Sequence, residues 1–138
     1  FLWDEEGWKE WGYAITIDSR PHVVVWEENG YFASEGDKFL RLTEHGRAGS
    51  VFNNVNAVSW VSLGESGNVL RAFEPLFRAE TDAGDGAPLA GESELDWTMG
   101  RHISASLNLI AQFTGFAEPI DPDWFESPRA RHWLLRLR

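Results

Sequence analysis

The apolar and polar residues near the N-terminus follow strand-like patterns. Tyr13–Asp18 (YAITID) alternates and is rich in β-branched residues, and His22–Glu27 (HVVVWE) is a continuous apolar run of strand length. Ser19-Arg20-Pro21, which lies between them, is typical of a turn. Because short turns favour antiparallel pairing, the pattern predicts a hairpin over residues 13–27.

A second hairpin is predicted in the middle of the chain. Residues Val51–Leu63 are predicted to form one long strand, and Asn68–Phe77 to return beside it. Gly64-Glu65-Ser66-Gly67 supplies the residues that a turn between them needs. Pro75 has no backbone N–H and marks an edge or the end of the second strand. We therefore expect an antiparallel hairpin from Val51 to Phe77.

Helical spacing and capping residues predict the remaining elements. A short helix is expected between Ser34, its N-cap, and Gly46. Apolar residues on one face predict an amphipathic helix over Arg101–Phe113, ended by Gly115. Ser127-Pro128 is typical of a helix start and predicts a last helix that runs to the C-terminus.

The order of these elements predicts the fold class. Strands precede most of the helices, which favours an α+β fold in which helices lie on a sheet. We expect an antiparallel sheet of about four to five strands with helices packed on one face. A chain of 138 residues without an evident linker is expected to form a single domain, residues 1–138.

Composition excludes several classes of protein. The net charge of -10 argues against a nucleic-acid binder, because phosphate contacts require a basic surface. The chain has no Cys, which excludes disulfides and thiolate metal sites, and it shows no histidine spacing or acidic loop suited to a metal. No apolar run approaches the roughly 20 residues needed to span a bilayer. We expect a cytoplasmic protein without a membrane segment, metal or cofactor.

Charge and aromatic residues are unevenly distributed. Residues Glu74–Asp96 hold seven acids and one base, whereas Pro128–Arg138 holds four Arg and no acid. These segments are either a solvated acidic loop and a basic last helix, or an acidic face that meets a basic partner. The eight Trp are more typical of a core than of a sugar platform, and Leu2–Trp11, which carries three of them, is expected to form a short helical turn.

The stretch SVFNNVNA, residues 50–57, is the most informative polar segment. Asparagine is unfavourable inside a strand, and alternation sends Asn53 one way and Asn54 and Asn56 the other. On that second face the two amides would lie near Trp60, an arrangement that suits a polar ligand. The alternative is that these asparagines form a bulge or satisfy backbone groups of a loop.

Two carboxylates lie in apolar surroundings. Glu27 follows the run VVVW, and Glu74 lies within AFEPLF. Such a carboxyl group can have a raised pKa and act as an acid or base, and the two would pair if their strands were neighbours. The alternative is that each accepts backbone hydrogen bonds at a strand end or faces water.

Several segments together resemble a known family. They are WEENGYFAS (Trp26–Ser34), RLTEHGRAGSVFNNVNA (Arg41–Ala57), FEPLF (Phe73–Phe77) and LIAQFTG (Leu109–Gly115). In order and spacing the chain resembles the uncharacterised actinobacterial DUF6461 family over roughly residues 23–124, and it departs from the pattern in the acidic segment and at the Arg-rich end. The resemblance implies a small cytoplasmic actinobacterial protein and implies no reaction.

Three functions remain open from the sequence. The first is a non-enzymatic interaction or small-ligand-binding domain, whose partner is a basic protein or a small polar ligand. Its expected site residues are Glu27, Asn29, Asn54, Asn56, Trp60 and Glu74. The second is an immunity-type inhibitor of a basic toxin, which the acidic charge would steer. The third is a small enzyme that uses Glu27 or Glu74 as acid or base.

Overall fold

The computed structural model describes residues 11–27, 34–77, 86–118 and 126–136. The chain divides into two compact units. We call Phe1–Gly30 with Glu118–Arg138 the terminal unit, and Tyr31–Ala117 the central unit. Each is described by itself, and the prediction that they form a single domain stays a prediction. The helical turn expected over Leu2–Trp11 lies outside the described residues, apart from Trp11.

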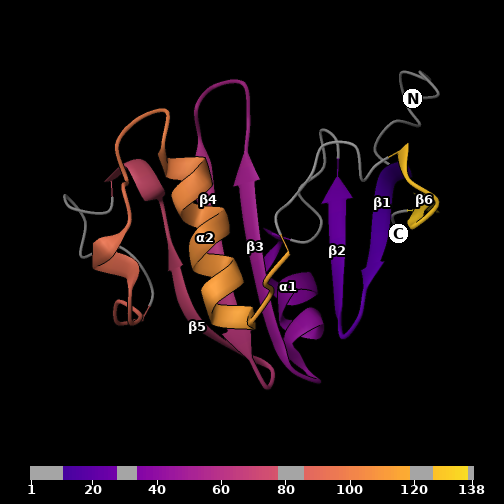
Figure 1. The fold of residues 1–138 in the computed structure, drawn as a ribbon, viewed down its shortest axis with the longest axis horizontal. Helices are drawn as coiled ribbons and strands as arrows, with labels where there is room; N and C mark the ends of the chain where they lie inside the picture. The colour runs from indigo at the N-terminus through magenta and orange to yellow at the C-terminus, as the bar shows by residue number, and fades with distance from the viewer. Residues whose placement is uncertain (1–10, 28–33, 78–85, 119–125, 137–138) are drawn as a thin grey trace. The chain divides into compact units, whose positions relative to one another are not determined.

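The central unit contains a three-stranded antiparallel sheet (Figure 1). Its strands are β3 (Arg47–Asn53), β4 (Ser59–Glu65) and β5 (Asn68–Phe73), in the order β3-β4-β5. The single long strand predicted over Val51–Leu63 is therefore wrong, because the chain turns at residues 54–58. The predicted turn at residues 64–67 joins β4 to β5, and β3 precedes them, so the three strands form an antiparallel meander.

The two helices of the central unit begin and end close to where the sequence predicts. Helix α1 covers Gly36–Thr43, but Ser34 does not cap it, since the Ser34 Oγ atom lies 2.6 Å from the Oγ atom of Ser50. Helix α2 covers His102–Thr114. Gly115 follows it with a φ of 75°, a left-handed conformation that glycine adopts without strain and that ends the helix as predicted.

The helices cover opposite faces of the sheet, whereas the sequence predicts one covered face. A Cβ atom on Gly49 would lie 2.6 Å from the side chain of Ile110 on α2. A Cβ atom on Gly64 would lie 2.7 Å from the side chain of Thr43 on α1. Gly49 pairs with Leu63, the neighbour of Gly64, and side chains alternate along a strand. Because glycine has no side chain, α2 packs closely against one face of the sheet at Gly49 and α1 against the opposite face at Gly64.

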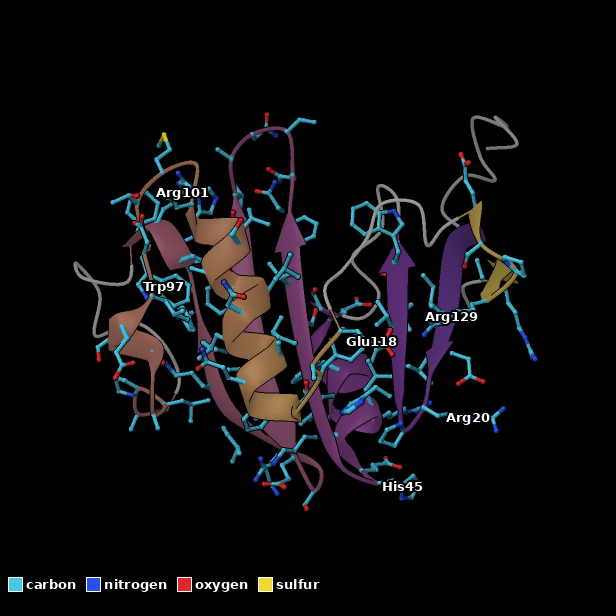
Figure 2. The ribbon with its side chains drawn as sticks, in the orientation of Figure 1. Arg20, His45, Trp97, Arg101, Glu118 and Arg129 are labelled. Atoms are coloured by element: carbon cyan, nitrogen blue, oxygen red, sulfur yellow. The ribbon has the colours of Figure 1, made fainter. Side chains whose placement is uncertain are left out.

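The hydrophobic core of the central unit lies between the sheet and α2. Its fully buried members are Val61, Leu63, Phe73 and Leu109. Partly buried residues from β3, α2 and the segment before α2 pack around them: Val51, Leu89, Leu95, Trp97, Ile110 and Phe113. Trp97, labelled in Figure 2, meets the ring of Phe73 edge-on at a centroid distance of 5.3 Å. Aromatic contacts of this geometry add to the stabilisation from burial.

A buried ion pair holds the segment before α2 against β5. The Arg71 guanidinium donates from Nη2 and Nε to the Glu92 carboxylate, at 2.8 and 3.1 Å, and from Nη1 to the Gly86 carbonyl at 3.0 Å. Glu92, in the 3₁₀ turn η3 (Glu92–Glu94), is fully buried. Of the predicted acidic loop, residues 78–85 lie outside the described part, and Glu92 is a structural acid rather than a solvated one.

The terminal unit contains a second three-stranded antiparallel sheet. Its strands are β1 (Trp11–Ser19), β2 (His22–Glu27) and β6 (Ala130–Arg136), in the order β2-β1-β6. The predicted N-terminal hairpin is confirmed. The predicted last helix is wrong: the segment pairs with β1 over seven residue pairs, because hydrogen bonding along a whole strand outweighs a local helix-start pattern. The α+β class is confirmed, with six strands in two sheets among the described residues.

Candidate functional site

Polar side chains converge at one end of the central sheet, where β3 and β5 end and β4 begins. Asn53 is the last residue of β3, Ser59 the first of β4, and Glu74 directly follows β5. The buried Ser59 hydroxyl donates to Asn53 Oδ1 at 2.9 Å, and its backbone N–H donates to Glu74 Oε2 at 3.0 Å. The backbone N–H of Leu76 donates to Glu74 Oε1 at 3.5 Å. Both carboxylate oxygens of Glu74 thus accept backbone hydrogen bonds.

Residues 54–58 form a turn that the Asn54 side chain organises. Asn54 Oδ1 accepts the N–H groups of Asn56, at 2.9 Å, and Val58, at 3.0 Å. The backbone closes the same turn, since the Asn54 N–H donates to the Val58 carbonyl and the Ala57 N–H donates to the Asn54 carbonyl. Ala57 has a φ of 58°. Of the two alternatives that the sequence leaves open, the structure therefore has Asn54 satisfying backbone groups of a loop.

We expect Asn54 and Asn56 to differ in what they contribute to stability. Asn54→Ala removes the acceptor of two backbone N–H groups and should lower the free energy of unfolding by about 1 to 2 kcal/mol. Asn56→Ala, the matched control in the same exposed turn, should change it by less than about 0.5 kcal/mol. Urea unfolding followed by tryptophan fluorescence measures both. Equal losses for the two variants would contradict the assigned role of Asn54.

The other predicted site residues are distributed over both units. Trp60 lies on β4, partly exposed, and pairs across the sheet with Phe52. The expected shared strand face of Asn54, Asn56 and Trp60 is wrong, because the two asparagines lie in the turn rather than in a strand. Glu27 ends β2 in the terminal unit, so its pairing with Glu74 stays a prediction. Asn29 lies outside the described residues.

Exposed apolar side chains gather at the same end of the central unit, which we call the apolar end. Val55, in the turn, is 98% exposed, and Met99, just before α2, is 79% exposed. Val58 and Phe77 are about half exposed, and Trp60 is 37% exposed. The members of the apolar end are Val55, Val58, Trp60, Phe77 and Met99. Exposed apolar side chains at one end of a folded unit are candidates for an interaction site.

The orientation of α2 places its first residue at the apolar end. Arg47, at the start of β3, donates from Nη1 to the carbonyl of Phe113, near the last residue of α2. The helix therefore begins at the other end of the sheet, the end that holds the β3–β4 turn, as Figure 1 shows. The 3₁₀ turn η2 (Pro75–Phe77) also contacts α2. Arg101, labelled in Figure 2, is exposed there.

Asp96 is the carboxylate with a shifted pKa near this end. The Thr98 hydroxyl donates to Asp96 Oδ1 at 2.6 Å, and the Thr98 backbone N–H donates to the same oxygen at 3.1 Å. These hydrogen bonds, with a smaller contribution from the charge of Arg101, hold the pKa of Asp96 below its usual value. Asp96 therefore stays ionised at any physiological pH.

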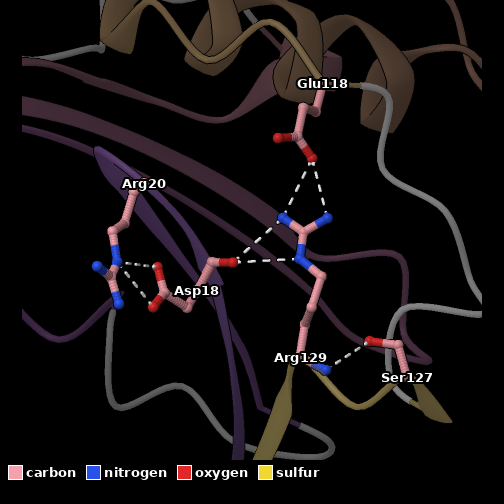
Figure 3. Close-up of polar contacts among 5 residues, drawn as sticks. All are labelled: Asp18, Arg20, Glu118, Ser127 and Arg129. Carbon is pink, nitrogen blue, oxygen red and sulfur yellow. Dashed lines mark hydrogen bonds and ion pairs between the residues drawn. The ribbon is translucent and has the colours of Figure 1, made fainter.

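A separate polar cluster belongs to the terminal unit (Figure 3). The Arg129 guanidinium donates to the Asp18 carbonyl at 3.1 and 3.2 Å and to the Glu118 carboxylate at 3.3 and 3.4 Å. Arg20 pairs with the Asp18 side chain at 3.1 Å. All these groups are exposed, and they use one another as partners. The cluster therefore fastens the start of β6 to β1, and its geometry offers no catalytic set.

The described residues include neither a metal-binding group nor a membrane-spanning helix. They contain no group of three or more His, Asp or Glu side chains that could hold a metal ion. None of the helices in the described ranges is long and apolar enough to cross a membrane.

Sequence reasoning did not select Val55 or Met99, although a valine within an asparagine-rich turn was a usable signal.

One comparison with known proteins gives a match. The model of a family described only as a family of unknown function (DUF6461) matches residues 5–114. No curated protein and no solved structure is significantly similar to the chain.

Proposed function

Because the chain belongs to the DUF6461 family, which has no assigned function, we propose its function from the geometry of the structure. We propose that it is a non-enzymatic interaction domain that binds a protein partner through the apolar end. The observation that carries the proposal is the exposure of five large apolar side chains at one end of the central unit. Val55 is almost completely exposed, so its side chain adds nothing to the core. A partner that covered this surface would gain the hydrophobic free energy that folding leaves unused.

The polar groups at the same end support binding of a protein over catalysis. The oxygens of Glu74 accept the N–H groups of Ser59 and Leu76, so this carboxylate is used to fix the end of the sheet. Asn54 Oδ1 is likewise used within its own turn. The polar groups therefore position the apolar ones, which favours a protein partner over a small polar ligand or an enzyme substrate.

Localisation in the cytoplasm, expected from composition and from the family resemblance, is part of the same proposal. An actinobacterial origin is expected from the resemblance alone. The immunity-type alternative is compatible with the apolar end, because an inhibitor also binds its target through a surface of this kind. It needs no catalytic residue in this chain.

We expect Val55→Asp to weaken binding of the natural partner by at least about tenfold, since it places a charge at the centre of an apolar contact. Affinity capture from an extract of the native cells, with quantitative mass spectrometry, measures the loss. Val69→Asp is the matched control, because Val69 is 40% exposed and is the second residue of β5, at the opposite end of the sheet. Thermal unfolding should show that both variants fold. Proteins retained equally by all three chains would contradict the proposal.

A further inference from the structure

The apolar end also indicates what kind of partner it fits. Resting on the proposed function, we propose that the β3–β4 turn is a preorganised apolar contact for a basic protein surface, one with an apolar centre ringed by Lys and Arg. The alternative occupant is a second copy of this chain. Three observations decide between them: the rigidity of the turn, the residue at its tip and the charge of the whole chain.

The turn is held in one conformation before any partner arrives. Four hydrogen bonds lie within it: two to Asn54 Oδ1, at 2.9 and 3.0 Å, and two between backbone groups, at 3.0 and 3.1 Å. Its base is fixed by Ser59, which bonds to Asn53 and to Glu74. A loop that is already ordered loses little conformational freedom when it binds. The turn therefore has the rigidity expected of a recognition element.

The tip of the turn carries a residue that a turn does not need. Turns favour Gly, Asn, Asp, Pro and Ser, each for a conformational reason, and Val offers none of these. Val55 is 98% exposed, so packing within the chain does not account for it. No charged residue occurs from Ala48 to Gly64, so the tip and the adjoining parts of both flanking strands are uncharged. The matching part of a partner is therefore apolar.

Charge selects the type of partner. The chain carries a net charge of -10, so two copies that approach each other are repelled at long range. A basic protein is attracted by the same field, which raises its rate of association. Near the apolar end, the exposed Asp96 and the exposed Arg101 carry opposite charges, so the net charge of the whole chain decides the sign of the partner. A partner with an apolar centre and a basic rim complements both the uncharged turn and the acidic chain that carries it, and a second acidic copy does not.

A pair of designed peptides tests the proposal. One is an amphipathic helix made only of leucine and lysine, and the other has glutamate in place of every lysine. We expect the leucine–lysine peptide to bind the full chain, with amide shifts in residues 54–58 by NMR, and to bind more weakly as salt is added. Val55→Asp should weaken it at least tenfold, Val55→Ser less, and Val69→Asp hardly at all.

The outcomes separate this inference from the proposed function. If the leucine–lysine peptide does not bind, or binds the Val55→Asp chain as tightly as the unmodified chain, the basic partner is wrong. If the leucine–glutamate peptide binds equally well and Val55→Asp abolishes that binding, the apolar end still binds proteins, but charge does not select them. If sedimentation shows a dimer that Val55→Asp dissociates, the occupant is a second copy.

Discussion

Replacing Glu92 with alanine is expected to lower the free energy of unfolding by about 3 to 5 kcal/mol, among the largest effects of any single substitution in this chain. The Arg71 side chain is 7% exposed, and its guanidinium would lose both hydrogen bonds to the carboxylate. A buried charge without its partner costs far more than the intact pair contributes. The Leu89 N–H, which donates to Glu92 Oε2 at 3.0 Å, would lose its acceptor as well.

Denaturant unfolding of a small set of variants checks this expectation. Glu94→Ala is the matched control, because Glu94 lies in the same 3₁₀ turn but is exposed, and it should change stability by less than about 0.5 kcal/mol. The double variant Arg71→Met with Glu92→Met removes both charges and should recover much of the loss. If Glu92→Ala cost no more than Glu94→Ala, the pair would not be buried in solution.

Gly86→Ala is the second substitution with a large expected effect, about 3 kcal/mol or more. Gly86 has a φ of 85°, and a Cβ atom there would lie 1.9 Å from the carbonyl oxygen of Leu70, so backbone must move. The movement would also disturb the Gly86 carbonyl, which accepts from Arg71 Nη1. The segment that carries Glu92 would then lose part of its attachment to β5.

The chain supplies a control for the conformational part of that cost. Gly100 has the same φ of 85°, but nothing lies within 4 Å of its built Cβ atom. Gly100→Ala should therefore cost only the left-handed strain, about 1 kcal/mol. The difference between the two melting curves measures the clash with Leu70. Equal losses would mean that the Gly86 segment does not pack against β5 as described.

The elements that sequence predicts well are those with local causes. The N-terminal hairpin and α2 follow from periodicity and from nearby turn or capping residues, and both form where expected. The prediction fails for the last strand, β6, because its partner strand is far away in the sequence. Ala130 pairs with Ile17, and the helix-start pattern at Ser127-Pro128 carries no information about that pairing. The placement of α1 and α2 on opposite faces of the sheet is also hard to predict, because it depends on the strand register. That register puts Gly49 and Gly64 on opposite faces.

The site is predicted in part, for a similar reason. Asn54 and Glu74 were selected as unusual polar residues, and both prove to be hydrogen-bonded at the same end of the sheet. Their hydrogen bonds hold a turn and the end of a sheet because the chain turns between Asn53 and Ser59, which strand alternation did not reveal. The buried Arg71 was detectable, since it shares a strand face with the buried Phe73 and so requires an acid. Which acid provides the charge depends on the folding of residues 86–97.

The pairing of β1 with β6 has a consequence for how the protein is made. Ile17 emerges from the ribosome long before Ala130, so β1 waits for its second neighbour through the synthesis of the whole central unit. The strands and helices of the central unit are all complete by Thr114, which is also where the family match ends. Once these residues have emerged, the central sheet can close while β1 still has an unpaired edge, and β6 completes the terminal sheet only after residues 130–136 have followed.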